Sequence, residues 1–222
     1  LSIRPAGVVV YEYDQAGIAA LDYIPKDMPK VVVGGSFGAG DYQIINAERD
    51  GGRWMTMHLL DLGHKTVFYV GRVQGATDNT RANGWKDALE ERGIEAPEPI
   101  VVSDGNLEKA VKAGHELGRR GEATAIFADS DETAIAVIRG LRETGRRVPD
   151  DVSVVGFDDR NFGALWEPSL TSYTQNFLDM GERSFRMLFE QIQAKRMGAD
   201  MPPSQIEVVQ GQPCLRASER EI

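Results

Sequence analysis

Two kinds of hydrophobic pattern alternate along the first two thirds of the chain. Short runs of β-branched residues are typical of buried strands, and longer stretches with an apolar residue every three or four positions are typical of amphipathic helices. The predicted strands are residues 7–11, 30–33, 66–70, 99–103, 124–128 and 152–156, and the predicted helices are 49–62, 80–92, 107–120 and 131–144. This alternation predicts an α/β fold in which helices cover both faces of parallel sheets.

The alternation ends after Gly156. The pattern is irregular over residues 160–168, and it then predicts a short strand at 170–173, a long helix at 177–195 and a last strand at 205–209. A long helix between late strands favours two lobes, with a chain that crosses between them more than once. Four predicted helices end at glycines that suit a left-handed cap, namely Gly63, Gly93, Gly121 and Gly145.

Polar residues follow two of the predicted strands directly. The strand at 152–156 runs into the carboxylates of Asp158 and Asp159. The strand at 124–128 is followed by Asp129, Ser130 and Asp131. Open α/β sheets bind small ligands at the carboxyl ends of their strands. The pattern therefore predicts a receptor for a small polar molecule.

Several of these positions have a structural alternative. Arg81, at the start of the helix 80–92, is suited either to clamping hydroxyls or a carboxylate of a ligand or to pairing with the aspartates. The polar residues at 129–131 are equally suited to capping the helix that follows, and we expect Asp131 to be the cap. Gln175 and Phe177 are either ordinary residues at the start of the long helix or part of a cleft wall.

Composition excludes several classes of site. The chain of 222 residues has a net charge of -9 and a single cysteine, Cys214, so an internal disulfide framework is excluded. Its three histidines have no metal-ligand spacing and are expected at helix ends or on the surface. Asp158 and Asp159 lack a third carboxylate or a nucleophile motif, which favours binding over catalysis or a metal site. No apolar run approaches the roughly 18 residues of a membrane span, so we expect a cytoplasmic protein.

The glycine-rich segment 34–40, GGSFGAG, has the spacing of a dinucleotide-binding loop. Such a loop opens a helix whose amino terminus faces the pyrophosphate. Here the next residues, 41–46, have an extended pattern, and the helix begins only near Asp50. We therefore expect no cofactor.

Taken in order, these motifs resemble the effector-binding region of the lactose-repressor (LacI/GalR) family of bacterial transcription regulators. The resemblance covers nearly the whole chain. It rests on the segments 61–64 (DLGH), 81–85 (RANGW), 125–131 (AIFADSD), 145–149 (GRRVP), 152–159 (VSVVGFDD), 168–171 (PSLT) and 215–218 (LRAS), with Gln175, Phe177 and Gly181.

The resemblance implies a two-lobed fold like that of type I periplasmic binding proteins, with the effector between the lobes. The lobes implied are residues 1–46 plus 176–203 and residues 47–174 plus 204–218. The chain begins at the strand that the family places after two earlier strand-helix units, so those units and the helix-turn-helix DNA-binding head are expected to be absent from it. The implied effector contacts are Arg81, Asp158, Ser130, Gln175 and Phe177.

Two departures from the family pattern bear on the ligand. Gly34 occupies a position where some members have a ligand-binding aspartate, and the aromatic residue that often stacks on a sugar is replaced near Gly105 and Asn106. The resemblance therefore implies a small polar effector, sugar-like or purine-like, without naming it.

The resulting hypothesis is a noncatalytic, homodimeric transcription regulator that binds operator DNA through a separate head. We expect the helix 131–144 to contribute to the dimer surface, because Ile135, Ile138 and Leu141 recur beside Val137. The alternative is that this helix packs entirely on its own sheet. A solute-binding protein of an ABC transporter is the second functional hypothesis, and a nucleotide-dependent oxidoreductase is the third.

We predict that this 222-residue chain by itself does not bind duplex DNA. Its 34 Asp and Glu outnumber its 25 Lys and Arg, whereas neutralising a phosphate backbone needs a concentrated basic surface. The local basic group, Arg139, Arg142, Arg146 and Arg147, is diluted by neighbouring acidic residues. Fluorescence anisotropy with labelled duplex at low salt checks this, and tight, salt-sensitive binding would contradict it.

Overall fold

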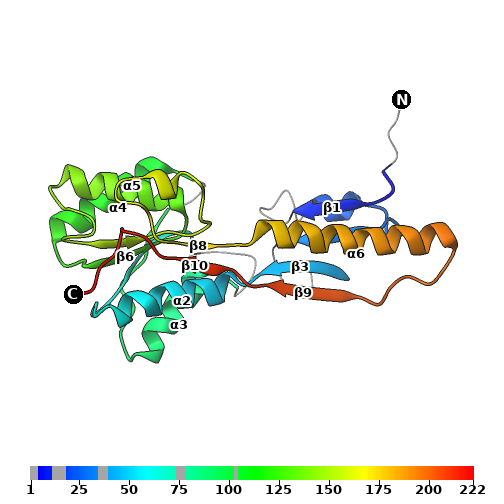
Figure 1. Cartoon of the computed structure of the whole chain (residues 1–222), viewed down its shortest axis with the longest axis horizontal. Coiled ribbons are helices and arrows are strands. Elements are labelled where there is room, and N and C mark those ends of the chain that lie inside the picture. The colour runs from blue at the N-terminus through cyan, green and yellow to red at the C-terminus, as the bar shows by residue number, and fades with distance from the viewer. Residues whose placement is uncertain (1–4, 12–18, 35–39, 74–78, 103–104) are drawn as a thin grey trace. The chain divides into compact units, whose positions relative to one another are not determined.

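The chain forms two compact units, each made of separate segments of the sequence. The computed structural model describes residues 5–11, 19–34, 40–73, 79–102 and 105–222. The first unit comprises Leu1–Ala47 and Asn176–Gln210, and the second comprises Glu48–Gln175 and Gly211–Ile222 (Figure 1). The chain thus passes between the units three times.

The third passage differs from the expected one near Pro203. Strand β9 (Gln205–Val209) pairs in parallel with β3 (Tyr42–Asn46) over its whole length, so it stays in the first unit. The passage follows at Gln210. The expected assignment of residues 204–210 to the second lobe is therefore wrong.

The first unit contains one parallel sheet in the order β1-β2-β3-β9, with β1 at Val8–Tyr11 and β2 at Lys30–Val33. A short 3-10 helix, η1 (Leu21–Tyr23), lies between β1 and β2 in the sequence. The long helix α6 (Phe177–Met197) packs on the sheet, where Met180 and Met187 meet apolar residues of the strands. Gln191 fastens this helix to β2, because its amide group accepts from Lys30 N at 3.0 Å and donates to Lys30 O at 3.1 Å.

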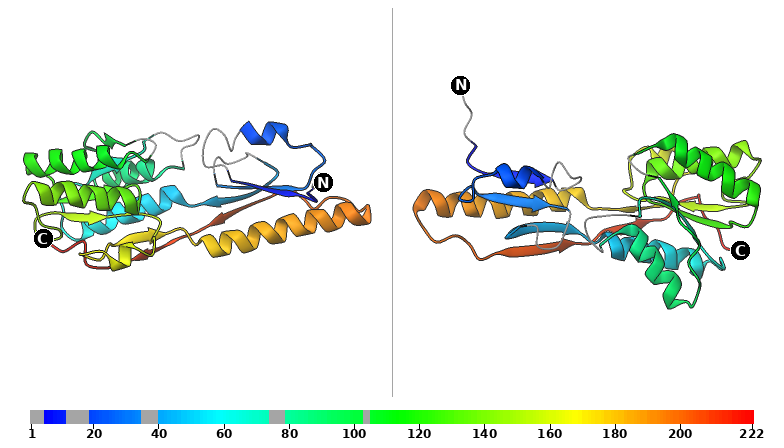
Figure 2. Two further views of the ribbon diagram at one scale, coloured as in Figure 1. Left: turned by 90° about the horizontal axis from the view of Figure 1, so that it is seen from above. Right: turned by 180° about the vertical axis from the view of Figure 1, so that it is seen from behind.

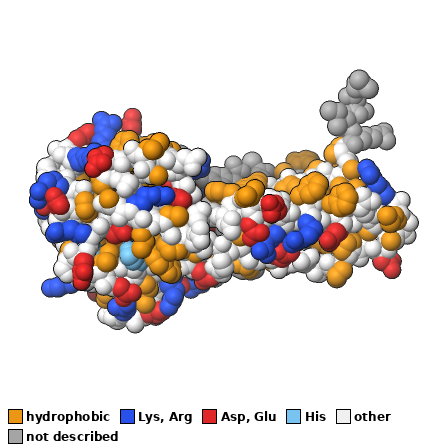
Figure 3. Space-filling view, in the orientation of Figure 1, with side chains coloured by type: hydrophobic (Ala, Val, Ile, Leu, Met, Phe, Trp, Pro, Cys, Tyr) orange, Lys and Arg blue, Asp and Glu red, His pale blue; other side chains and the backbone are white. Residues whose placement is uncertain are grey.

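The outer side of α6 is partly apolar. Leu178 and Phe185 are largely exposed, and Phe189 stacks on Phe185 with 6.0 Å between the ring centroids. Hydrophobic side chains lie beside charged ones along the surface of this helix in Figure 3. Even so, none of the helices in the described ranges is both long and apolar enough to cross a membrane.

The second unit is built around the parallel sheet β5-β4-β6-β7. Its strands are β4 (Phe68–Gly71), β5 (Ile100–Val101), β6 (Ala125–Ala128) and β7 (Ser153–Val155), and its helices are α2 (Glu48–Asp61), α3 (Arg81–Glu91), α4 (Leu107–Arg120) and α5 (Asp131–Glu143). Helices α2 and α3 cover one face and α4 and α5 the other (Figure 2).

Burial on both faces explains the unbroken apolar runs of the central strands. In β6, Ala125 and Phe127 point into the core on the α2–α3 side, whereas Ile126 and Ala128 point into the core on the α4–α5 side. Beyond the sheet, a 3-10 helix, η2 (Gly163–Leu165), precedes β8 (Ser172–Thr174), which pairs antiparallel with β10 (Gln212–Cys214). The last segment is tied back to the sheet, since Val154 N donates to Ser218 O at 2.8 Å and Thr171 N donates to Ser218 Oγ at 2.9 Å.

The structure removes three residues from the dimer surface expected on α5. Val137, Ile138 and Leu141 have no exposed surface, because they pack on the sheet and α4 in the same core. Ile135 is only half-buried. These three side chains therefore serve the fold of this unit, and a contribution of α5 to a dimer surface through Ile135 stays a prediction.

One histidine lies at a helix end, as expected, but is buried. His64 follows α2, but it is buried and lies between two hydroxyl groups, Thr124 Oγ1 at 3.0 Å from Nδ1 and Ser153 Oγ at 3.1 Å from Nε2. Burial lowers the pKa of His64. This side chain joins the end of α2 to the strands rather than facing solvent.

We predict that Gly140→Ala destabilises the second unit by about 1–3 kcal/mol, the usual range for an overpacked core. A Cβ at Gly140 would overlap the carbonyl oxygen of Val111, and one at Gly114 would overlap that of Val137, so α4 and α5 touch through their glycines. Chemical denaturation measures the change.

Gly181→Ala in α6 is the matched control. Its added Cβ meets no atom within 4 Å, so the substitution is expected to stabilise the chain by about 0.5–1 kcal/mol through helix propensity alone. Equal effects of the two alanines would contradict the proposed close contact.

Candidate functional site

Arg81 is held at the start of α3 by local structure on both sides. The side chain of Thr80 caps the helix, with Asn83 N donating to Thr80 Oγ1 at 3.1 Å. Gly52 of α2 lies so close that a Cβ there would overlap the backbone of Arg81. The Arg81 side chain is 6% exposed, so its guanidinium group is fixed inside the second unit.

Acceptors from three segments surround this guanidinium group. Nη2 lies 2.9 Å from Asp158 Oδ1 and 3.0 Å from Glu48 Oε1, while Nη1 donates to the carbonyl oxygen of Asp129. The group also lies over the ring of Phe157, with Cζ 4.0 Å from the centroid. Burial lowers the pKa of Arg81, but the attraction of Glu48, Asp158 and Asp129 outweighs burial and raises it overall. The guanidinium group therefore stays charged.

Asp158 reaches Arg81 from a turn after β7. Its φ of 97° lies in the left-handed region, as does the φ of 50° at Asp159, and both are unusual for residues other than glycine. Gln175 Nε2 donates to Asp158 Oδ1. The structure thus brings together Arg81, Asp158 and Gln175 from distant parts of the sequence, and the role of this group as a binding site remains a prediction.

Ser130, rather than Asp131, is the cap of α5. Its hydroxyl oxygen accepts from Thr133 N at 3.2 Å and lies 2.9 Å from Thr133 Oγ1. The expectation that Asp131 caps the helix is therefore wrong. Asp129, at the end of β6, accepts from Arg72 N at 2.9 Å.

Asp131 has a different and fully buried environment. Its Oδ1 accepts from the hydroxyl of Ser172 and its Oδ2 from Arg160 N, each at 2.5 Å. Burial raises the pKa of Asp131 to about 7, against the opposing effect of these two hydrogen bonds and with the support of the nearby charges of Asp158 and Asp159. Asp159 in turn lies 2.6 Å from Arg216 Nη2.

Sequence reasoning missed three members of this site: Glu48, Phe157 and the buried carboxyl group of Asp131. Glu48 is the first residue of α2, where a carboxylate is ordinary because it suits the helix dipole. Phe157 looks like a core residue in the sequence, and it is one, at 1% exposure. Its position directly before Asp158 is the one signal in the sequence that could have indicated a place in this site.

Phe177 lies in the other unit. It is the first residue of α6, follows Asn176 with its left-handed φ of 52°, and is about half exposed. Its predicted contact with an effector stays a prediction. Of the glycine-rich segment 34–40, residues 35–39 lie outside the described residues.

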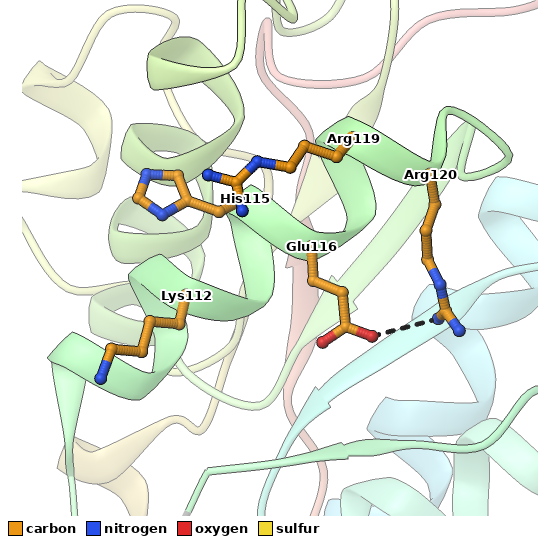
Figure 4. A pocket seen from close by; sticks show the side chains of 5 residues that line it. All are labelled: Lys112, His115, Glu116, Arg119 and Arg120. Atoms are coloured by element: carbon orange, nitrogen blue, oxygen red, sulfur yellow. Dashed lines mark ion pairs between the residues drawn. The ribbon is translucent and has the colours of Figure 1, made fainter.

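A separate surface depression of about 400 Å³ lies along α4 (Figure 4). It is lined by Lys112, His115, Glu116, Arg119 and Arg120. Glu116 pairs with Arg120 at 3.3 Å, and none of these side chains belongs to the group around Arg81. No set of three or more His, Cys, Asp or Glu that could hold a metal ion occurs among the residues with described positions.

The chain is similar to known regulators over most of its length. The family model for the periplasmic binding protein-like domain matches residues 56–218. The HTH-type transcriptional regulator CelR of Thermobifida fusca is 34% identical over 171 residues, which are 74% of this chain and 50% of CelR. The HTH-type transcriptional repressor PurR of Yersinia pestis is 33% identical over 195 residues, 85% of this chain and 57% of PurR. The chain thus spans about half the length of these curated relatives.

Solved structures have the same fold. A complex of the transcriptional regulator CelR with cellobiose matches with a TM-score of 0.82 and 28% identity, over 96% of this chain and 65% of the other. A dimeric lac repressor matches with a TM-score of 0.82 and 24% identity, over 98% of this chain and 79% of the other. At that identity, the second likeness shows the fold alone.

We predict that Ser130→Ala lowers stability by about 1 kcal/mol, because it removes the side-chain acceptor at the start of α5. Ser130→Asn retains a capping oxygen and is expected to stay within a few tenths of a kcal/mol of the wild type. Urea denaturation of both variants checks this. An alanine variant as stable as the asparagine variant would show that the cap contributes nothing.

Proposed function

The chain belongs to the lactose-repressor (LacI/GalR) family of bacterial transcription regulators, and we propose that it is the effector-binding region of such a regulator. The observation that carries the proposal is the buried guanidinium of Arg81, held between Glu48 and Asp158 at the carboxyl ends of β4, β6 and β7. A set of fixed charges and amide groups at these strand ends is suited to binding a small polar ligand.

The charge of the site favours a neutral effector. Two arginines, Arg72 and Arg81, lie among three carboxylates, those of Glu48, Asp129 and Asp158, so negative charge exceeds positive by one. Both terminal nitrogens of Arg81 already contact acceptors. A phosphate or carboxylate would have to displace them, whereas ligand hydroxyls can donate to the carboxylates.

A neutral saccharide therefore fits better than a sugar phosphate. The CelR complex contains cellobiose, a neutral disaccharide, and cellobiose is the first compound to test. A purine is the second candidate, since PurR is about as similar as CelR in sequence. The aromatic ring beside Arg81, that of Phe157, is buried under the guanidinium group. A purine base has no access to stack on this ring, so a purine effector is a weaker proposal than a saccharide.

We propose binding without catalysis, at work in the cytoplasm. The relatives reported above are transcriptional regulators, which favours regulation over the alternative of a transporter's solute-binding protein. The effector would alter operator binding by a DNA-binding head in a homodimer. It can do so only if it binds two arrangements of the protein with different affinity.

We predict that Asp158→Asn weakens binding of the effector by about 1.5–3 kcal/mol, roughly ten- to a hundredfold, the scale of a hydrogen bond to a charged group. Isothermal titration calorimetry with cellobiose, and with glucose 6-phosphate as the anionic comparison, measures this. Arg81→Ala is expected to weaken binding at least as much, because it leaves Glu48 and Asp158 without their cation.

Asp61→Asn is the control variant. Asp61 is an exposed residue at the end of α2 whose carboxylate pairs with Arg92, and its replacement is expected to leave affinity unchanged. Tighter binding of glucose 6-phosphate than of cellobiose would contradict the proposal that the effector is neutral. Unchanged affinity in Asp158→Asn and Arg81→Ala would overturn the site.

A further inference from the structure

We propose that Asp131 is a positioning residue for this site, whose carboxyl group holds the turn at residues 157–160 in the conformation that carries Asp158 to Arg81. The inference rests on the proposed function only in assigning effector binding to Asp158. Asp131 contacts the turn rather than Arg81 and acts through it.

Three backbone groups of the turn, Phe157 O, Asp159 N and Arg160 N, bond to Asp131 or to its partner Ser172. Asp131 N donates to Phe157 O at 2.9 Å, and Asp131 Oδ2 accepts from Arg160 N at 2.5 Å. Ser172 Oγ donates to Asp131 Oδ1 and accepts from Asp159 N at 3.0 Å. The amide of Asp158 itself donates to Tyr173 O at 2.8 Å.

The turn needs such support because of its backbone. Asp158 and Asp159 are consecutive non-glycine residues with positive φ, a strained conformation that persists only where the surrounding structure holds it. The carboxyl group of Asp131 is also closely enclosed: a Cβ at Gly156 would lie 2.5 Å from Oδ1, and one at Gly163 would lie 3.6 Å from Oδ2. The absence of side chains at both glycines leaves room for this carboxyl group.

The charges around Asp131 make its role depend on pH. Asp158 and Asp159 face it from the turn and the Cys214 thiol faces it from β10. The cations nearby have other partners, since Arg160 pairs with Glu132 at 3.7 Å and Arg216 with Asp159. With a pKa raised from 3.8 to about 7, Asp131 holds its proton more tightly in the closed turn than in an opened one. Opening therefore becomes easier as pH rises from about 4 to 7, and no further change is expected above that.

Amide hydrogen exchange at Asp158, Asp159 and Arg160 in the unliganded chain tests this, after correction for intrinsic exchange rates. In the wild type, protection at these amides is expected to fall by at least about tenfold between pH 5 and pH 8. Asp131→Asn keeps an acceptor for Arg160 N and gains a donor toward Ser172 Oγ, so it imitates the protonated form. It is expected to keep the protection at pH 8 and to lose the pH step.

Asp131→Ala is expected to lower protection at these three amides by at least about tenfold at both pH values. It is also expected to weaken the binding of cellobiose as much as Asp158→Asn does. Asp61→Asn should match the wild type throughout. The alanine variant is at risk of not folding, so the comparison of the wild type with Asp131→Asn is decisive without it. The proposal is overturned if protection in the wild type does not change between pH 5 and pH 8, or if it changes equally in Asp131→Asn. Failure of the wild type to bind cellobiose would overturn the saccharide assignment, and the exchange profile would still decide the role of Asp131.

Discussion

A buried positive charge organises the second unit. An arginine inside a protein costs several kcal/mol unless acceptors surround it, and Arg81 obtains them from the first turn of α2, the end of β6 and the turn after β7. Each acceptor lies on a different element, so a shift of any one would leave a buried charge without its partner. The position of α3 against the sheet and the direction of the 157–160 turn are thus consequences of the same requirement.

Of the four aspartates that follow these strands, Asp158 is the one whose carboxylate pairs with Arg81. Asp129, Asp131, Asp158 and Asp159 look interchangeable in the sequence, yet each has its own partner: a backbone amide, a hydroxyl, Arg81 and Arg216, respectively. Identical charges so close together repel one another and oppose burial. Burial and this repulsion together raise the pKa of Asp131 to about 7.

Local patterns predicted most elements, because periodicity and glycine caps are local. The helix at 107–120 and the strand at 205–209 have the predicted bounds, and Gly63, Gly93, Gly121 and Gly145 all have positive φ. What failed depended on partners far along the chain. The pairing of β9 with β3 moved the third passage from Pro203 to Gln210, and the contact of α5 with α4 buried Ile138. Whether an aspartate is a cap or a buried acid depends on Ser172 and Arg160, which no spacing near Asp131 indicates.

Gln175 is a partner of Asp158 and also ends the first of the two segments that make up the second unit, one peptide bond before the left-handed Asn176. A ligand hydroxyl that competes for Asp158 Oδ1 would therefore release a side chain whose own backbone is one of the links to α6. Coupling between two sites is reciprocal. If ligand binding shifts the preferred torsion angles of that link, a substitution that shifts those angles must change the affinity for the ligand. Residues that never touch the ligand, Asn176 first among them, would then tune the sensitivity of the sensor.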